Sequence, residues 1–564
     1  MRRSLVAITV GFTSFATLLF ELTQTRILSY IFWNHVVYLT VSLALLGFGI
    51  SGTFVALFAS RRTLFSPRVL ARLLLGFGVS GFGAVALTAW VLPRLGLAGW
   101  GNLLFCYVVY VVPFIFAGAI LTIILSSSVA AVGALYSVDL LAAGFGCVLF
   151  FFLLPFLGAP TLVTLLAGLA LALAVGWSER RDRVVRMSGL VGVAALAAVA
   201  VIQGLRPSFL DFVPVPDKEM GTFLDDGRYP NARIEQTTWT PIGRIDVVGD
   251  DQEPLWGYPH PPGSYKIITQ DGTAHTRLIS QQLSEELAAA AAGGAPGDPE
   301  SLTYQIKPNA DVGIIGVGGG IDVARALAHG ARSVYGVELN PATYRYAAEV
   351  YAGYNGDLMD DPRVTLVNGE GRNTLQAVDR EFDVIQVIAI DTFAALSSGA
   401  YVLSENYLYT VEAFEEMFDR LKPDGILAYY RWLFMPPRET LRLSAIACEA
   451  WQRRGIDDCS QRIMVVGRDG WALSLFKQTP FTSGEVQQLN VQAAAMGLWV
   501  LHWPQIFPPQ EQAQAEAGYY AAAGPAVIGT AQAFTGLTAA YREGREAEFF
   551  AAYQYNVAPT TDDS

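Results

Sequence analysis

The stretch Val312–Asn340, VGIIGVGGGIDVARALAHGARSVYGVELN, decides the fold of the region around it. An apolar run ends in a glycine cluster, a short helical pattern follows as far as Gly330, and a second apolar run ends in Glu338. Glycines at the end of a strand let the backbone approach a nucleotide closely, and an acid about twenty residues further on suits the hydroxyls of a ribose. We therefore expect a nucleotide-binding strand–helix–strand unit, the alternative being a tight turn without a ligand. The glycines are Gly316, Gly318, Gly319 and Gly320.

Beyond this stretch, apolar runs continue to alternate with helical patterns. The runs at 364–367, 383–389 and 425–431 are typical of strands, and the patterns at 371–379 and 410–421 are typical of helices. Alternation at this spacing predicts an α/β fold with a doubly wound, mostly parallel sheet.

The end of this region departs from a plain dinucleotide-binding fold. The run RIMVV (462–466) is followed by the turn Arg468-Asp469-Gly470 and the run WALSLF (471–476). An Asp-Gly turn between two short apolar runs predicts a hairpin. It therefore predicts one antiparallel strand in an otherwise parallel sheet.

A small β-rich subdomain is expected before the nucleotide-binding unit. GRIDVVG (243–249) and SYKIITQDG (264–272) are typical of short strands, and the second ends in an Asp-Gly turn. The residues between 206 and 263 otherwise lack long periodic runs and are rich in turn-forming residues.

The first part of the chain is strongly apolar. The 564 residues are 52% hydrophobic and 16% charged, with a mean hydropathy of +0.36. Most of the apolar segments reach the roughly 20 residues that a helix needs to cross a bilayer. We therefore predict an α-helical multi-pass membrane domain of about seven helices, at 4–33, 35–60, 69–93, 102–126, 130–157, 160–177 and 187–205.

Arginines mark alternate loops of this membrane domain. The N-terminus and the loops near residues 61–72 and 180–186 are arginine-rich, whereas only Arg94 and Arg206 fall on the other side. The positive-inside rule places the N-terminus in the cytoplasm, and seven crossings then leave residues 206–564 outside. Because a nucleotide cofactor is cytosolic, we nevertheless expect a cytoplasmic soluble domain at the plasma membrane. That arrangement requires 160–177 or 187–205 not to cross.

Three ionisable residues interrupt the apolar segments: Glu21, Arg26 and Asp139. Charges at membrane depth are costly and face a partner or a cavity. One interpretation is a substrate or ion path. The other is a structural pair between Arg26 and one of the two acids.

The net charge and the cysteine spacing limit the classes of ligand and partner that we expect. Residues 1–205 carry a net charge of +8 and residues 206–564 one of −20, so nucleic acid is not expected as a partner. An acidic domain favours cationic small molecules, and the cysteine spacing predicts no metal site. Cys448 and Cys459 are expected to be reduced thiols, the alternative being a pair formed in an oxidising compartment.

The hairpin ending resembles the class I S-adenosylmethionine (SAM)-dependent methyltransferase fold and its relative, spermidine synthase. A closer resemblance, over residues 1–480, is to the membrane-fused spermidine-synthase-like family. The segments that carry it are GFTSFATLLFELTQTRILSYIF, GALYSVDLLAAGFGCVLFFFLLPFLG (133–158), ITQDG, GVGGG, VELNP, NGEGR, DVIQ and LSENYLYTVEAF.

Residue patterns and the resemblance together suggest a division of the chain. We expect a transmembrane domain (1–205), a linker with a small β-rich subdomain (206–300), a spermidine-synthase-like, SAM-binding Rossmann-type domain (301–480) and, beyond the resemblance, a helical, aromatic extension (481–564). Relatives usually continue past an ending such as APTTDDS, so the chain is expected to be a fragment or to stop early.

The resemblance also assigns roles to single residues. Gly316, Gly318, Gly319 and Gly320 would line the methionine side of SAM or decarboxylated SAM, the expected co-substrate. Glu338 would hold the ribose, and Glu370 with Gly371 would lie near the adenine. The expected catalytic residues are Asp391, beside the reacting centre, His275 and Tyr407, with Tyr401 and Tyr409 as further walls of the acceptor site.

Three positions depart from the pattern of spermidine synthases. Ile321 replaces the aspartate that grips the cationic acceptor, Ile388 stands at the expected base, and His275 replaces a glutamine. Without two carboxylates a diamine is poorly neutralised and its amine poorly deprotonated. Asp322 would be a substitute, but it begins a helix and should point elsewhere.

We therefore expect a transferase that moves an alkyl group, methyl or aminopropyl, from SAM or decarboxylated SAM to a small acceptor. The acceptor would be cationic or delivered from the membrane, and the partners would be the lipid bilayer and, in a homo-oligomer, further copies of the chain. One alternative is spermidine synthase activity proper. Another is a non-catalytic nucleotide-sensing domain that regulates a membrane transporter or channel.

Overall fold

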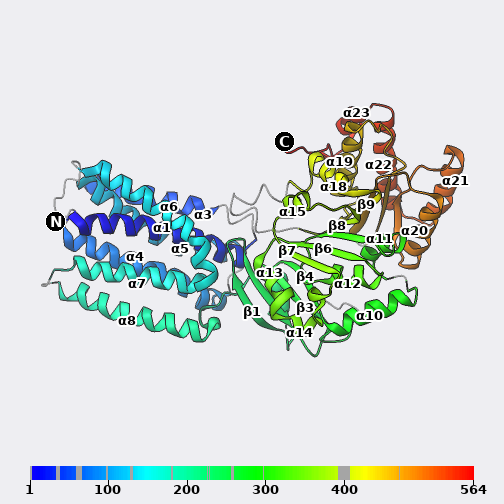
Figure 1. Ribbon diagram of the computed structural model, residues 1–564. Coiled ribbons are helices and arrows are strands. Elements are labelled where there is room, and N and C mark those ends of the chain that lie inside the picture. The colour runs from blue at the N-terminus through cyan, green and yellow to red at the C-terminus, as the bar shows by residue number, and fades with distance from the viewer. Residues whose placement is uncertain are drawn as a thin grey trace.

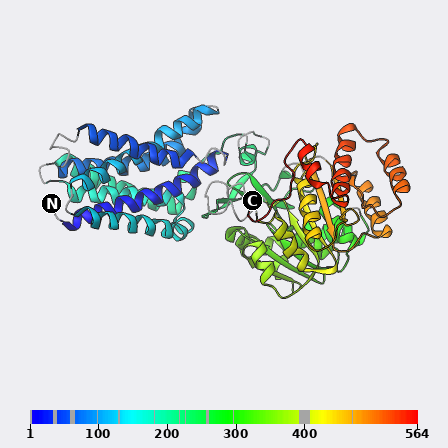
Figure 2. The ribbon, with the colours of Figure 1, turned by 90° about the horizontal axis from the view of Figure 1, so that it is seen from above.

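A helical region and an α/β region lie side by side in the computed structural model, with the N-terminus at the far end of the helical region (Figure 1). A view from above shows the same two regions end to end (Figure 2). The structure describes residues 3–33, 39–58, 66–96, 99–127, 131–179, 182–216, 218–224, 227, 229–255, 260–295, 297–390, 407–468 and 470–563.

The helical region contains a helix at each of the predicted apolar segments. Within the described ranges, seven helices are long and apolar enough to cross a membrane by length and composition. They are α1 (Arg3–Ile31), α3 (Leu39–Phe58), α4 (Pro67–Trp90), α5 (Trp100–Ser127), α6 (Val132–Leu157), α7 (Ala159–Trp177) and α8 (Arg183–Leu205).

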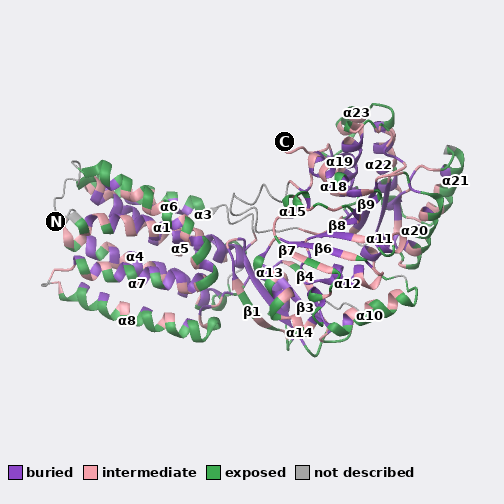
Figure 3. Ribbon diagram, in the orientation of Figure 1, coloured by how far each residue is buried: buried purple, intermediate pink, exposed green. Residues whose placement is uncertain are grey.

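The outward faces of these helices are exposed (Figure 3), and they carry large apolar side chains. Phe152 and Phe156 of α6 are 67% and 85% exposed, and Leu205 of α8 is 79% exposed. Contiguous exposed apolar surface indicates a partner other than water, and helices of this length match the thickness of a bilayer. The helical region is therefore suited to membrane association.

Ionisable groups inside this region find polar partners. The Ser14 hydroxyl donates to the Asp139 carboxylate, and the Arg26 guanidinium donates to the carbonyl of Ile242, 2.7 Å away. Arg26 thus reaches across to the second region of the molecule.

A four-stranded antiparallel sheet follows the helical region, with the order β1-β2-β3-β4. The predicted strands at 243–249 and 264–272 are confirmed as β2 and β3. β3 turns into β4 through Asp271 and Gly272, whose φ angles are both positive at 50° and 69°. Such a turn matches the twist of the strands it joins. The strands are β1 (Arg233–Trp239), β2 (Arg244–Gly249), β3 (Tyr265–Gln270) and β4 (Ala274–Ile279).

The larger sheet has eight strands in the order β12-β10-β11-β9-β8-β5-β6-β7. The run from β9 to β7 is parallel, and β11 pairs antiparallel with both β9 and β10. The predicted hairpin is therefore confirmed. The strands are β5 (Asp311–Ile315), β6 (Ser333–Glu338), β7 (Val364–Asn368), β8 (Phe382–Ile388), β9 (Leu421–Trp432), β10 (Ile463–Arg468), β11 (Trp471–Lys477) and β12 (Trp499–His502).

The expectation of a single antiparallel strand is wrong. β12 pairs antiparallel with β10, so two strands, β11 and β12, run against the parallel set. β12 has only four residues, which is too short to show an alternating pattern.

Helices cover both faces of the larger sheet (Figure 1). Val384 of β8 belongs to the same buried cluster as Val323, while its neighbour Ile385 packs in the cluster of Phe414. Alternate residues of one strand thus enter opposite layers. The helices of the α/β region are α9 (Glu219–Leu224), α10 (Gln281–Ala292), α11 (Leu302–Ile306), α12 (Ile321–Ala328), α13 (Pro341–Arg345), α14 (Ala352–Asn355), α15 (Gly371–Ala377), α18 (Val411–Asp419), α19 (Glu439–Arg453), α20 (Ser483–Ala495), α21 (Pro509–Tyr520), α22 (Pro525–Arg542) and α23 (Glu546–Ala552).

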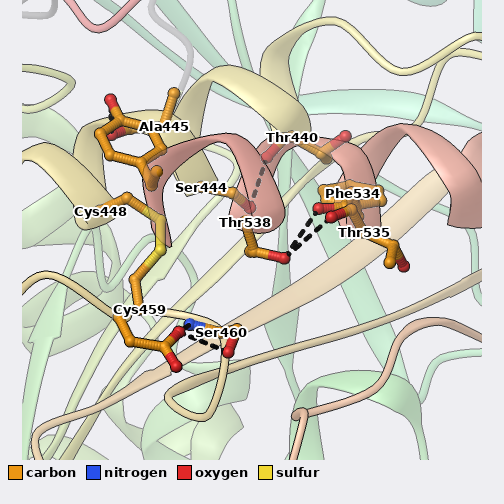
Figure 4. The surroundings of a disulfide bond; sticks show 11 residues. Thr440, Ser444, Ala445, Cys448, Cys459, Ser460, Phe534, Thr535 and Thr538 are labelled. Atoms are coloured by element: carbon orange, nitrogen blue, oxygen red, sulfur yellow. Dashed lines mark hydrogen bonds between the residues drawn. A yellow bond between two sulfur atoms is a disulfide. The ribbon is translucent and has the colours of Figure 1, made fainter. Parts of the chain in front are cut away.

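A disulfide bond joins Cys448 of α19 to Cys459, which precedes β10 (Figure 4). Both residues are 1% exposed. The expectation of reduced thiols at these positions is therefore wrong. That expectation assumed a reducing compartment. The Cα atoms of the two cysteines, which are 11 residues apart in sequence, lie 5.3 Å apart, a distance that suits a disulfide bond.

Replacing both Cys448 and Cys459 with serine should lower the free energy of unfolding by about 3 kcal/mol, because a loop of this length is constrained in the unfolded chain. Denaturant unfolding of the detergent-solubilised protein measures the change. Cys147→Ser is the matched control, since Cys147 is a free thiol in α6. Equal stability of the double variant and the parent chain would contradict the expectation.

Lys218 joins the two regions. Its ammonium is fully buried and donates to the carbonyls of Ser29 (2.6 Å), Tyr30 (3.0 Å) and Asp271 (2.7 Å). Ser29 and Tyr30 lie in the last turn of α1, where a cation complements the helix dipole. Asp271 lies in the β3–β4 turn, so one side chain fastens the end of α1 to this hairpin.

Arg244 of β2 strengthens the same joint. Its guanidinium carbon lies 4.0 Å from the centre of the Tyr30 ring, and it pairs with Asp211 and with Asp246, the latter at 2.9 Å. Its backbone N–H donates to the Asp271 carboxylate (2.8 Å). Charge, ring and backbone contacts therefore converge on the end of α1.

Candidate functional site

The glycine loop between β5 and α12 has the backbone that a nucleotide loop needs. Gly316, Gly318 and Gly320 have φ angles of 81°, 56° and 94°, a region that residues with a Cβ rarely adopt. The loop begins at the carboxyl end of β5, where ligands bind in open α/β sheets.

Glu338 at the end of β6 holds this loop in place. One carboxylate oxygen accepts from the N–H of Gly318 (2.9 Å), and the other accepts from the N–H of Asn340 (2.8 Å). Burial raises the pKa of Glu338, although these backbone hydrogen bonds lower it. Each carboxylate oxygen keeps a further lone pair, so the group can still accept from two hydroxyls.

Strand β4 of the small sheet packs directly against the glycine loop. The N–H of Gly319 donates to the Thr276 hydroxyl (3.1 Å), and Leu278 forms a bridge with Gly320. A Cβ on Gly319 would overlap the carbonyl of Arg277. The small sheet therefore supports the loop, and Thr276 is a site residue that sequence reasoning missed because its partner lies 43 residues away.

Gln270 is a second residue that sequence reasoning missed. Its side-chain carbonyl accepts from the amide of Asn340 (3.0 Å), while its Nε2 is buried without a hydrogen-bond partner among the described residues. A buried donor without a partner is costly and suits a polar ligand group. The available signal was its place in QDG, directly before the turn.

Glu370 and Gly371 lie at the same edge of the sheet, since Glu338 pairs with Asn368 at the end of β7. The Glu370 carboxylate accepts from the N–H groups of Arg372 (3.1 Å) and Asn373 (2.8 Å) and thereby caps α15. A Cβ on Gly371 would overlap Ile315. The expected adenine contact of this pair stays a prediction.

Of the three expected catalytic residues, the structure describes His275 and Tyr407, and each has contacts of its own. His275 Nδ1 lies 3.2 Å from a Glu219 carboxylate oxygen, and His275 faces away from its neighbour Thr276 because strand residues alternate. The Tyr407 carbonyl accepts from Arg372 (3.0 Å). Asp391 lies outside the described residues, as does Tyr401. The catalytic roles stay predictions.

Tyr409, the other expected wall residue, is engaged inside the α/β region. Its hydroxyl accepts from Arg431 (2.6 Å), and its ring packs 5.9 Å from that of Tyr429. Its role at an acceptor site likewise stays a prediction.

Asp322, the acid closest to the glycine loop in sequence, points into a buried ion cluster. It lies 2.6 Å from the Arg325 guanidinium, which also pairs with Asp298 and Glu300. Burial raises the pKa of Asp322 and Arg325 lowers it. Its carboxylate is therefore already engaged by an arginine, which it shares with two other acids.

The glycine loop, the acid at the end of β6 and the hairpin-ended sheet together define an α/β domain with a mixed sheet and a loop suited to a nucleotide. Residues 303–431 match the family model described as "Spermine/spermidine synthase domain". The resemblance to spermidine-synthase-like proteins is thus confirmed in this part of the chain. No curated protein sequence matches the chain significantly.

Solved structures similar to this chain include three enzymes. Spermidine synthase from Thermotoga maritima is 19% identical over 51% of this chain and 88% of that chain, with a TM-score of 0.31. A probable spermidine synthase from Corynebacterium glutamicum is 16% identical over 47% and 85%, with a TM-score of 0.29. A ribosomal protein L11 methylase from Lactobacillus delbrueckii subsp. bulgaricus is 17% identical over 35% and 80%, with a TM-score of 0.21. Values this low do not establish a shared activity.

Proposed function

We propose that this protein is a membrane-associated, aminopropyltransferase-like enzyme that uses decarboxylated SAM or SAM as a co-substrate. The observation that carries the proposal is the contact between Glu338 and the glycine loop within the segment that matches the family model. In this proposal the loop receives the sulfonium side of the nucleoside and Glu338 accepts from its ribose hydroxyls.

Two side chains offer groups that suit the nucleoside. The carboxylate of Glu338 keeps lone pairs, and the buried Nε2 of Gln270 offers a donor. The glycines let the loop lie against β4, which a Cβ would overlap. Glu370 and Gly371 complete the proposed site on the adenine side.

The proposed reaction is a direct displacement at carbon. An acceptor amine forms a new N–C bond with the carbon next to the sulfonium, the C–S bond breaks, and its electron pair leaves with the sulfur as a neutral thioether. The amine loses a proton to a base. Because the sulfonium is already activated, the protein contributes mainly by positioning the two reactants.

Two residues beside the glycine loop bear on the choice of acceptor. Ile321 is apolar and Asp322 is engaged by Arg325, so neither supplies a free carboxylate for a diamine. We therefore propose transfer to a small amine in general, of which spermidine synthase activity proper is one special case. Transfer of a methyl group from SAM is the alternative to transfer of an aminopropyl group.

A second candidate function is nucleotide sensing without catalysis. The observation in its favour is the joint at Lys218, which fastens α1 to the hairpin whose second strand packs directly against the glycine loop. A nucleoside bound at the loop would then act on the helical region.

Calorimetric titration of the detergent-solubilised full chain with SAM, decarboxylated SAM and methylthioadenosine tests the proposal. We expect binding of decarboxylated SAM, followed by formation of methylthioadenosine when amines are added. Binding without turnover for any amine would favour sensing. Absence of binding to all three nucleosides would overturn both candidates.

Replacing Glu338 with glutamine should weaken nucleoside binding by at least about tenfold, or about 1.4 kcal/mol. The amide has one acceptor oxygen in place of two, so the loop N–H or a ribose hydroxyl loses its partner. Calorimetry measures the change. Glu349→Gln, at an exposed position, is the matched control, and equal affinities of both variants would speak against the assignment.

Binding should also depend on pH through Glu338. Burial raises its pKa above the ordinary 4.5, so the carboxylate becomes protonated at a higher pH than an exposed glutamate does, and one of its acceptor sites then becomes a donor. We expect nucleoside affinity to fall on acidification with a midpoint above pH 4.5, and Glu338→Gln to lack this transition. If the parent chain binds the nucleoside with constant affinity across this pH range, the Glu338 carboxylate is not a ligand.

A further inference from the structure

Four described arginines of the helical region, Arg68, Arg72, Arg183 and Arg186, lie at the same end of it. Arg68 pairs with Glu179 at 2.7 Å and Arg72 with Asp182 at 3.5 Å, which brings the start of α4 beside the end of α7 and the start of α8. Since α1 to α8 alternate in direction, the N-terminus lies at this end as well. We call it the arginine end, because the stretches of sequence at or next to these helix ends contain Arg2, Arg3, Arg61, Arg62, Arg68, Arg72, Arg180, Arg181, Arg183 and Arg186.

The α/β region lies at the opposite end of the helices. Ile31 at the end of α1 accepts from the N–H of Val215 (2.9 Å), and the Trp90 indole at the end of α4 donates to the carbonyl of Phe209 (2.9 Å). Gly158, between α6 and α7, lies against the Trp239 ring. Three arginines of residues 1–206 belong to this end: Arg26, whose guanidinium contacts Ile242, and Arg94 and Arg206.

Cysteine chemistry gives a separate indication. Residues 206–564 contain two cysteines, and the structure joins them as Cys448–Cys459. The two free cysteines, Cys106 and Cys147, lie in the helices α5 and α6. Disulfides persist in oxidising compartments and are rare in the cytosol of mesophiles.

We propose that residues 206–564 lie on the non-cytoplasmic side of the membrane, with the arginine end in the cytoplasm. Lysine and arginine concentrate in cytoplasmic loops, and an odd number of crossings puts the α/β region opposite the N-terminus. The cytoplasmic placement expected from the cofactor needed one of the last two segments not to cross. Both are continuous helices, of 19 residues in α7 and 23 in α8.

This placement does not depend on the proposed function. If the proposed function also holds, the nucleoside and the acceptor must reach the non-cytoplasmic face. A sulfonium nucleoside carries a fixed charge and does not cross a bilayer unaided. A transport step or an external pool must then supply it.

Cysteine labelling of the full chain in intact cells tests the placement. Ala289→Cys places a thiol on exposed α10, and Ala131→Cys places one before α6 at the arginine end. A membrane-impermeant maleimide should label Ala289→Cys in intact cells and Ala131→Cys only after permeabilisation. The parent chain gives the background from Cys106 and Cys147.

The reverse pattern, with Ala131→Cys labelled in intact cells and Ala289→Cys only after permeabilisation, would overturn the placement. Labelling of both thiols before permeabilisation would overturn it too. As a second readout, acid-quenched cells are alkylated with and without a reductant. Cys448 and Cys459 should react only after reduction, and their direct alkylation would refute an oxidising compartment. Neither readout requires enzyme activity, so the result stands apart from the proposed function.

Discussion

Replacing Gly319 with alanine should reduce nucleoside affinity at least about a hundredfold, which corresponds to about 2.7 kcal/mol. The added Cβ would overlap the carbonyl of Arg277 and the amide nitrogen of Leu278. Both are backbone atoms of β4, which β3 holds along its whole length. The glycine loop must therefore move, and the N–H of Gly319 leaves Thr276. Calorimetry with decarboxylated SAM measures the effect.

Gly353→Ala is the matched control for this experiment. Gly353 lies in α14, and a Cβ there meets nothing within 4 Å, so alanine should leave binding unchanged. Retained binding in Gly319→Ala would show that the loop does not hold the nucleoside, provided that both variants unfold at the temperature of the parent.

Replacing Lys218 with methionine should lower the free energy of unfolding by about 3–5 kcal/mol. Methionine preserves most of the side-chain volume but leaves three buried carbonyls, those of Ser29, Tyr30 and Asp271, without their donor. Buried acceptors without partners and broken buried charge contacts cost this much together. Thermal unfolding in detergent measures the loss.

Arg233→Met is the control for charge removal alone. Arg233 and its partner Asp251 are 67% and 64% exposed in their side chains, and such surface pairs contribute about 1 kcal/mol or less. A Lys218→Met variant as stable as Arg233→Met would show that the joint contributes little to folding.

The parts of the fold set by local pattern could be predicted from the sequence. The run from Val312 to Glu338 gave its two strands and the intervening helix, because apolar periodicity and glycine placement act over a few residues. β12 was missed because its four residues gain their strand conformation only by pairing with β10. Tertiary context decides such short segments.

The residues of the site likewise fall into those that local sequence pattern predicts and those that depend on tertiary contacts. Glu338 was found because it ends a strand at a fixed spacing from the glycines, and the structure places it on Gly318. Thr276 and Gln270 were missed because they lie in the small sheet, and their partners Gly319 and Asn340 are distant in sequence. The disulfide was missed for another reason, since its formation depends on the compartment rather than on spacing.

Because of the joint at Lys218, the helical region and residues 206–564 do not fold independently of each other. Composition changes abruptly near residue 205, yet excision of residues 206–564 would remove two of the three acceptors of Lys218 and the ring beneath Arg244. The excised part should therefore unfold at a lower temperature than the same part of the intact chain. The helical region therefore does more than attach the α/β region to a membrane, because the last turn of α1 completes the buried contacts of Lys218 and Arg244.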